Sequence, residues 1–166
     1  DSERFHPKLN GAKIRQELNL ADSPVMLSVG AIRPVKGFHL LLQAFNQVKQ
    51  QIPEAKLIII GKHTFDYYSE QLKELSDGSV TFIDCVPNQE LPQYYAACDL
   101  YATCSLWETY NRPLVEAQTC GKPVVAFNIG PHPEVINNGG VLVEAGNIAQ
   151  FAQACIDKLR QVKRST

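Results

Sequence analysis

The chain has 166 residues, of which 45% are apolar and 20% are charged, a balance typical of a soluble globular domain that can bury a sizeable core. Its formal net charge of −1 offers no broad electrostatic attraction to nucleic acid or to an anionic membrane. We therefore expect no nucleic-acid partner, and we expect membrane association only through regions outside this chain.

Five cysteines, none of them in a C-x-x-C pair, lie mostly within apolar runs. This pattern predicts buried free thiols in a reducing compartment, and neither a disulfide framework nor a zinc site. The sequence has no secretory signal and no apolar run of membrane-spanning length, so we expect a cytoplasmic protein, at most peripheral at the inner face of a membrane. Because it begins at Asp1, we expect it to be a piece of a longer protein.

Residues 1–11 are polar and include Pro7 and Gly11, which predicts an interdomain linker that leads into one domain at 12–166. Within that domain, apolar runs of strand length alternate with segments of helical periodicity. We expect strands at 25–30, 56–60, 80–83, 99–103 and 123–127, and a further short apolar run at 141–143. We expect helices at 12–18, 36–51, 66–75, 91–97 and 113–120, and an amphipathic helix at 148–162. A loop is expected at 31–35, and a Pro/Gly-rich loop before residue 141.

Strands that are apolar throughout and alternate with helices indicate a parallel sheet covered on both faces. Right-handed crossovers then predict an α/β fold, a Rossmann-like doubly wound parallel sheet. Ligands of such folds bind beyond the carboxyl ends of the strands. Here those ends lead into loops at Gly30, Gly61, Asp84 and Ser105.

The loop after the first strand carries two basic residues beside a glycine. Gly30 ends the strand and would let a ligand approach the backbone closely. Lys36 stands at the predicted helix start, where a cation is unfavourable unless an anion compensates it. With Arg33, which can offer a forked donor, the loop predicts a site for an anion such as a diphosphate. The alternative is two solvated basic residues in a surface loop.

Two glutamates flank the start of the helix predicted from Pro113, a residue that suits a first helical turn because it has no N–H to leave unpaired. Glu108 precedes the helix and Glu116 lies about one turn into it, so both carboxylates can face the helix N-terminus. That end attracts phosphate, whereas carboxylates pair with neutral donors such as sugar hydroxyls. The combination predicts a nucleotide-sugar site. The alternative is ordinary capping by a glutamate.

The sequence lacks the motifs of several other classes of α/β protein and of metal sites. The sequence contains neither G-x-G-x-x-G nor a P-loop, which disfavours a dinucleotide-dependent dehydrogenase, and no serine lies in a G-x-S-x-G elbow. A receiver domain needs acidic residues at the end of its first strand, and residues 28–30 have none. His39 and His63 have no partners at metal-ligand spacing, so we expect no metal site.

Taken in order, these motifs resemble the C-terminal, donor-binding domain of family 4 retaining glycosyltransferases, which have the GT-B fold. The resemblance rests on a strand followed by G-x5-K-G at 30–37, on E-x7-E at 108–116, and on the segments 1–7, 120–126, 130–136 and 139–143. It implies that the chain is one half of a GT-B fold and that the N-terminal, acceptor-binding domain is absent.

The resemblance implies a role for each charged site residue. Lys36 would contact the donor diphosphate and, with Arg33, stabilise it as the leaving group. Glu116 would accept hydrogen bonds from the ribose hydroxyls, and Glu108 would meet the transferred sugar near its 3- and 4-hydroxyls, where some schemes place a nucleophile. No metal and no cofactor is needed besides the donor substrate.

Backbone groups complete the implied site. The N–H groups of Tyr110, Asn111 and Arg112 would cradle the sugar and the phosphate, and the loop at Val86 would receive the base. The sequence departs from the family's pattern at several positions, including His63 and Cys85, where the family usually has glycine. The usual arginine after the strand glycine is Ala31, and two usual glycines are Thr109 and Asn111.

The implied reaction transfers a sugar, with retention, from a nucleoside diphosphate-sugar to a sugar, glycan or lipid-linked acceptor. Family frequency favours a mannosyl- or glucosyltransferase of surface-polysaccharide synthesis. We expect the isolated domain to be inactive because the acceptor half is missing. The alternative is a non-catalytic nucleotide-binding or interaction module with the same fold.

Overall fold

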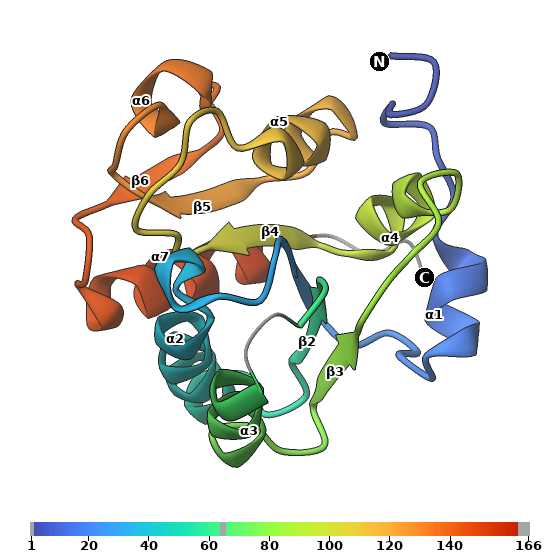
Figure 1. The fold of residues 1–166 in the computed structure, drawn as a ribbon. Helices are drawn as coiled ribbons and strands as arrows, with labels where there is room; N and C mark the ends of the chain where they lie inside the picture. The colour runs from blue at the N-terminus through green and yellow to red at the C-terminus, as the bar shows by residue number, and fades with distance from the viewer. Residues whose placement is uncertain (1, 64–65, 163–166) are drawn as a thin grey trace.

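A six-stranded sheet in the order β3-β2-β1-β4-β5-β6, parallel at every pairing, forms the centre of the computed structural model, which describes residues 2–63 and 66–162 (Figure 1). This confirms the predicted doubly wound parallel sheet. The end residues of the predicted linker and domain, 1 and 163–166, lie outside the described part. The strands are β1 (Val25–Val29), β2 (Lys56–Ile60), β3 (Val80–Ile83), β4 (Leu100–Thr103), β5 (Val124–Phe127) and β6 (Val141–Val143).

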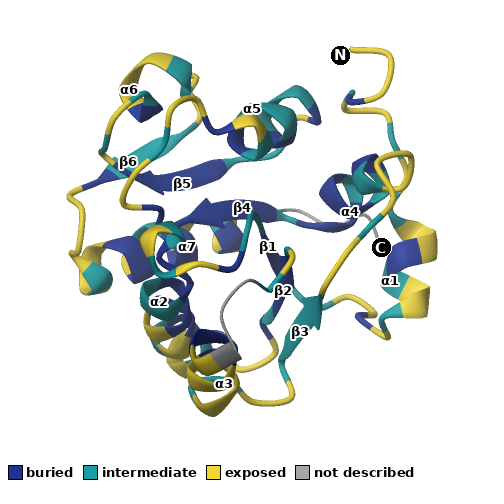
Figure 2. Ribbon diagram, in the orientation of Figure 1, coloured by how far each residue is buried: buried dark blue, intermediate teal, exposed yellow. Residues whose placement is uncertain are grey.

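Helices cover both faces of the sheet (Figure 2). One face packs against α2, α3 and α7, and the other against α1, α4 and α5. None of the helices in the described residues is both long and apolar enough to span a bilayer. The helices are α1 (Ala12–Glu17), the 3₁₀ turn η1 (Pro34–Lys36), α2 (Phe38–Gln51), α3 (Asp66–Glu74), α4 (Leu91–Ala97), α5 (Arg112–Thr119), α6 (His132–Val135) and α7 (Ile148–Gln161).

The strands are apolar throughout because both of their faces are buried. In β1, Met26 packs in the core cluster under α2 and α7, whereas Val25 and Leu27 pack in the cluster under α1, α4 and α5. Full burial of one such side chain stabilises the fold by about 1.5–3 kcal/mol. A strand with water on one face would alternate polar and apolar residues, and this sequence pattern does not.

The start of α2 differs from the prediction. Lys36 does not open this helix, because Gly37 has a left-handed backbone (φ 71°) that separates the 3₁₀ turn η1 from α2. A Cβ on Gly37 would lie 1.9 Å from the Cys104 carbonyl oxygen, so the turn is pressed against the end of β4. The lysine is therefore placed by a tight turn and not by the first turn of a helix.

Two smaller expectations also change. Residues His132–Val135, expected as loop, form the short helix α6 after β5. Four cysteines are buried as predicted, but Cys85 is exposed in the loop after β3, so the prediction is wrong there. Burial raises the pKa of the Cys98 thiol to about 12 and that of Cys120 to about 11, which keeps both protonated at neutral pH.

The strand order reverses between β1 and β4, and these neighbours pair only at Met26 and Leu27. Beyond that point, the backbone N–H and C=O of Val29 are met by the Tyr101 hydroxyl, each at 3.1 Å. A side chain thus replaces the strand ladder where the two strands diverge. The chain then turns to α2 on one face and to α5 on the other, which opens a crevice at the carboxyl ends.

Substitution of Gly37 by alanine is expected to destabilise the fold by about 2–4 kcal/mol, because it adds left-handed strain and a backbone clash. Gly146→Ala, at φ 87° in open space, should cost only about 1 kcal/mol of strain. Gly78→Ala, with open space and no positive φ, should change stability by less than about 0.5 kcal/mol. Urea unfolding measures all three, and equal effects of the Gly37 and Gly146 substitutions would refute the close approach.

Candidate functional site

Two loops face each other across the crevice between β1 and β4. The loop after β1 carries Lys36, and the loop after β4 carries Glu108. They are joined by a backbone hydrogen bond of 2.9 Å from the Leu106 N–H to the Val35 carbonyl, in addition to the Gly37 contact with Cys104. The two charged residues are therefore carried on one connected rim.

Lys36 and Glu108 form an ion pair at the centre of this rim, with 2.7 Å between Nζ and Oε1. Their side chains are only 18% and 12% exposed. Ser105 Oγ lies 3.0 Å from the same carboxylate oxygen and 3.1 Å from the Trp107 carbonyl, so its single hydrogen can serve only one of them at a time. Both contacts to Glu108 go to Oε1, and no described group donates to Oε2, which can accept a hydrogen bond from a ligand.

The N-terminus of α5 forms the opposite wall. Asn111 caps this helix in the left-handed conformation (φ 71°), and its Oδ1 accepts a hydrogen bond from the Leu114 N–H at 3.3 Å. Pro113 has no N–H, and the Val115 N–H bonds to the Asn111 carbonyl. Of the first-turn amides, only the Arg112 N–H donates to no described acceptor, and it is available to an anion at the positive end of the helix dipole.

A buried histidine lies behind this wall. His132 is fully buried, its Nε2 is 2.9 Å from Asn111 Nδ2, and its Nδ1 is 2.7 Å from the Phe127 carbonyl oxygen. Desolvation by burial lowers its pKa. This histidine falls within the segment predicted as a Pro/Gly-rich loop. No spacing signal connects it with Asn111, because the two meet only after β5 has formed.

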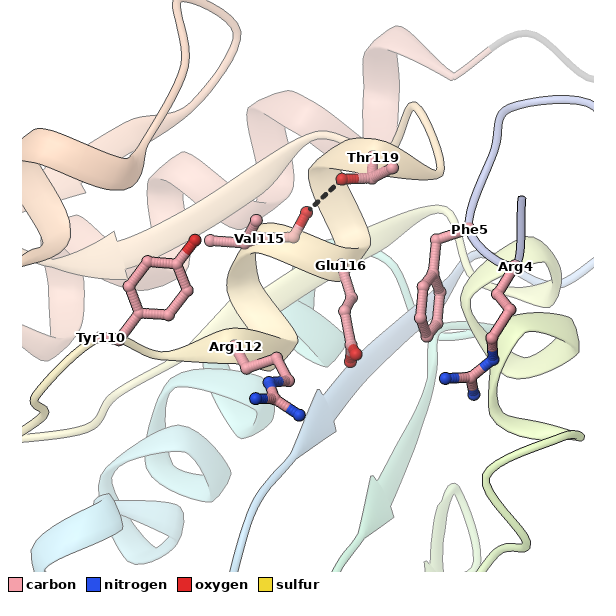
Figure 3. Close-up of a pocket in the computed structure, with 7 residues that line it drawn as sticks. All are labelled: Arg4, Phe5, Tyr110, Arg112, Val115, Glu116 and Thr119. Carbon is pink, nitrogen blue, oxygen red and sulfur yellow. Dashed lines mark hydrogen bonds between the residues drawn. The ribbon is translucent and has the colours of Figure 1, made fainter. Parts of the chain in front are cut away.

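Glu116 lies further along α5, where Tyr95 fixes its carboxylate. The hydroxyl of the fully buried Tyr95, on α4, donates to Glu116 Oε1 at 2.9 Å. Burial and the nearby carboxylate raise the pKa of Tyr95, so it stays a donor. Figure 3 shows the Glu116 carboxylate between the Arg112 guanidinium and the Phe5 ring.

Two neighbouring depressions contain most of the predicted residues. One, of about 390 Å³, lies between the two loops, and the other, of about 430 Å³, lies over Glu116 (Figure 3). Both include Tyr110 and Arg112, so they adjoin at the α5 N-terminus. Among the predicted site residues, the first depression brings together Gly30, Arg33, Lys36, Glu108, Tyr110, Asn111 and Arg112.

The structure does not bring Val86 into either depression. This residue is partly buried against the core cluster of α1, α4 and α5. Thr109, which replaces an expected glycine, does not have a positive φ, so it causes no left-handed strain. Asn111 does have one and tolerates it, as asparagine does better than most residues.

The predicted linker contributes to the second depression. Phe5 is 2% exposed and meets Tyr95 edge to face, with ring centroids 5.7 Å apart. Arg4 lies over the Phe5 ring, 4.9 Å from its centroid, and donates to the Asn88 carbonyl. Sequence reasoning did not foresee these contacts, because the segment reads as polar.

The charge of the site is positive apart from its two glutamates. Arg33, Lys36 and Arg112 line the first depression with Glu108 as the one acidic side chain among its lining residues. In the described part of the chain, no three histidine, cysteine, aspartate or glutamate side chains gather as a metal ion would need. The arrangement can hold a polyanion between Lys36 and the α5 N-terminus and can accept hydrogen bonds at two carboxylates.

Known proteins are similar to this chain in sequence and in fold. The chain is 30% identical over 177 residues to spore coat protein SA of Bacillus subtilis, covering 96% of this chain and 47% of that protein. It is 28% identical over 180 residues to a GDP-mannose-dependent α-(1-6)-phosphatidylinositol monomannoside mannosyltransferase of Mycolicibacterium smegmatis, covering 99% of this chain and 46% of that protein. The chain thus spans about half the length of these relatives.

Among solved structures, Anabaena HepE in complex with UDP and glucose matches with a TM-score of 0.87 and 29% identity, over 97% of this chain and 45% of that one. The model of the family described as glycosyl transferases group 1 matches residues 11–165. The family model matches nearly the whole chain, which shows that this chain belongs to the glycosyl transferases group 1 family.

Proposed function

We propose that this chain is the donor-binding half of a family 4, GT-B retaining glycosyltransferase. It binds a nucleoside diphosphate-sugar in the crevice between β1 and β4, and the sugar passes to an acceptor held by a domain that this chain does not contain. The observation that carries the proposal is that Lys36, Glu108 and Arg112 line one depression, that Glu116 lines the depression adjoining it at Arg112, and that the Arg112 N–H has no acceptor among the described residues.

The diphosphate lies between Lys36 and the α5 N-terminus in this proposal. A leaving diphosphate gains negative charge as the bond to the sugar breaks, and donors that are already oriented stabilise that charge most. The Lys36 ammonium, the Arg112 N–H and the helix dipole are such donors, and Arg33 lines the same depression. These cations and amides serve without a metal ion or a further cofactor.

Without a ligand, the Lys36 ammonium is neutralised by its ion pair with Glu108. A diphosphate competes with Glu108 for the Lys36 ammonium, so binding releases Oε1 of Glu108 from one of its two partners. The carboxylate can then accept from hydroxyls of the transferred sugar. In the same way Glu116, held by Tyr95 through one oxygen, offers the other to the ribose hydroxyls. The base extends toward the loop at Cys85 and Val86.

The donor sugar is proposed to be mannose or glucose, and the product a surface polysaccharide. The support is the relatives' own descriptions, which include a GDP-mannose-dependent mannosyltransferase, a spore coat protein and a complex with UDP and glucose. We place the reaction in the cytoplasm, with contact to the inner face of the membrane through other parts of the full-length protein.

Nucleoside diphosphate binding tests the site directly. We expect Lys36→Met and Glu116→Gln each to weaken the tightest ligand among UDP, GDP and ADP by about 10- to 100-fold in calorimetry, since each removes one charge-assisted hydrogen bond. Lys49→Met is the matched control, because Lys49 pairs with Asp77 toward the far end of α2 and its side chain is 22% exposed. If none of the three nucleotides binds, or if both site variants behave like the control, the donor-site proposal fails.

Glu108→Gln should separate the sugar from the nucleotide. The amide cannot form the ion pair, so Lys36 is released and nucleoside diphosphate affinity should stay equal or rise by a few-fold. The extra affinity of the sugar nucleotide over the bare diphosphate should fall, because the amide has one acceptor oxygen instead of two and lacks the negative charge that strengthens hydrogen bonds from sugar hydroxyls. Parallel titrations with UDP and UDP-glucose, and with GDP and GDP-mannose, measure this difference. An equal loss for nucleotide and sugar nucleotide would contradict the sugar contact and would indicate that Glu108 acts by positioning Lys36.

The purified chain alone is expected to show no sugar transfer, because the acceptor site is proposed to lie in a domain that it lacks. Incubation with labelled UDP-glucose and GDP-mannose and a panel of sugar and lipid acceptors tests this, with the full-length protein as the positive control. Transfer by the 166-residue chain would show that acceptor binding needs no further domain.

A further inference from the structure

Two buried side chains behind the α5 N-terminus have no role in the function proposed above. They are Asn111, which is 7% exposed, and His132, which is fully buried, and they contact each other. We infer that His132 is a positioning residue of the donor site: through Asn111 it fixes the direction of the Arg112 N–H. The expected effect of His132 on donor binding rests on the proposed function, whereas the hydrogen bonds from His132 to Asn111 and Phe127 do not depend on it.

Hydrogen-bond chemistry assigns every proton in this contact. The Phe127 carbonyl can only accept, so His132 Nδ1 must carry a hydrogen and donate it at 2.7 Å. Asn111 Oδ1 already accepts from the Leu114 N–H, so Nδ2 faces the ring and donates to His132 Nε2 at 2.9 Å. The ring is therefore the neutral Nδ1–H tautomer, with Nε2 as an acceptor.

A neutral ring is consistent with its surroundings. Burial lowers the pKa of His132, and nearby Lys36 acts in the same direction. The Phe127 carbonyl and Glu108 act in the opposite direction and raise it. A protonated ring would place an N–H against the Asn111 amide hydrogens and would break the contact.

The Asn111 backbone needs this support because it is left-handed, with φ 71° and ψ 71°. The ψ angle of Asn111 sets the plane of the peptide that carries the Arg112 N–H. A rotation at Asn111 would therefore turn away the one first-turn amide that has no acceptor among the described residues. Glycine adopts such backbone angles without strain, but nothing in a glycine side chain restricts it to them. The Asn111 backbone can be restricted through the hydrogen bonds of its side chain.

The support continues into the sheet. Phe127 is the last residue of β5, and prolines at 131 and 133 flank His132 in α6, which restricts its backbone. A hydrogen-bonded series thus runs from the end of β5 through the imidazole and the Asn111 amide to the Leu114 N–H. Rigid support of this kind is what pre-organises a binding amide before the ligand arrives.

Three variants separate positioning from general stability. His132→Phe keeps a ring but removes both hydrogen bonds, and His132→Gln retains one donor and one acceptor. Gln118→Met is the matched control, because Gln118 ties the C-terminal turn of α5 to the Val135 carbonyl and the Asn137 N–H, away from the cap. All three weaken or alter contacts between α5 and the α6 region, but only the histidine variants touch the cap.

Hydrogen exchange on the 166-residue chain is the ligand-independent measurement. We expect His132→Phe to reduce the protection of the Leu114 amide about tenfold relative to Ala117 in the same helix, and His132→Gln to retain most of it. Gln118→Met should leave the Leu114 amide unchanged relative to Ala117. In the wild type, ¹H–¹⁵N spectra should show His132 protonated at Nδ1 only. An imidazolium or an Nε2–H tautomer at neutral pH would overturn the inference, as would unchanged Leu114 protection in His132→Phe.

Binding adds the functional readout. For whichever of UDP, GDP and ADP binds the wild type most tightly, His132→Phe should weaken affinity about 5- to 10-fold, and His132→Gln should recover it to within about threefold. In an Asn111→Gly background the same His132→Phe change should cost no further affinity, because the side chain that it acts through is gone. Equal losses in both backgrounds would refute positioning through Asn111. If no nucleotide binds the wild type, the proposed function fails, and hydrogen exchange alone decides the inference.

Discussion

The reversal of strand order between β1 and β4 is the constraint on which this site depends. Two neighbouring strands send their chains to opposite faces of the sheet, so their following loops must diverge at the carboxyl end. The divergence leaves backbone groups of Val29 without a ladder partner, and the Tyr101 hydroxyl meets them. The crevice therefore follows from the strand order, and the Val29 backbone groups at its base are hydrogen-bonded without a ligand.

Charge and backbone geometry turn this crevice into a specific site. Gly37 lets the η1 turn approach the end of β4 closely, and that approach places Lys36 against Glu108. On the other wall of the crevice, the Asn111 side chain accepts a hydrogen bond from the Leu114 N–H, and Pro113 has no N–H. The Arg112 N–H is therefore the one first-turn amide of α5 without an acceptor among the described residues. Each carboxylate is held through one oxygen by a hydroxyl, from Ser105 or Tyr95, and has a second oxygen for a ligand.

Local patterns were enough to predict the sheet and both loops of the site. Apolar runs mark strands that are buried on both faces, and the proline at 113 marks the start of α5 within one residue. The positions of Lys36, Glu108 and Glu116 beyond the strand ends followed from the same patterns. The break at Gly37 was missed, because lysine and glycine are compatible with either a helix start or a turn, and only the contact with Cys104 decides between them.

Contacts between distant segments were not predictable. His132 and Asn111 are separated by β5, and a single amide–imidazole hydrogen bond has no periodicity to reveal it. Phe5 lies in a polar segment but is buried against Tyr95, which the sequence around it does not indicate. The Lys36–Glu108 ion pair likewise depends on how close two loops come, and no local pattern encodes that distance.

In the function proposed here, a nucleoside diphosphate-sugar lies between the η1 turn and the α5 N-terminus. Amide chemical-shift mapping of the chain with UDP-glucose and GDP-mannose tests it most directly, because it locates the ligand residue by residue. With the cognate donor, we expect the largest shifts at the amides of Ala31, Lys36, Asn111 and Arg112, and smaller ones near Glu116. Shifts centred elsewhere on the sheet, or none with either donor at millimolar concentration, would contradict it.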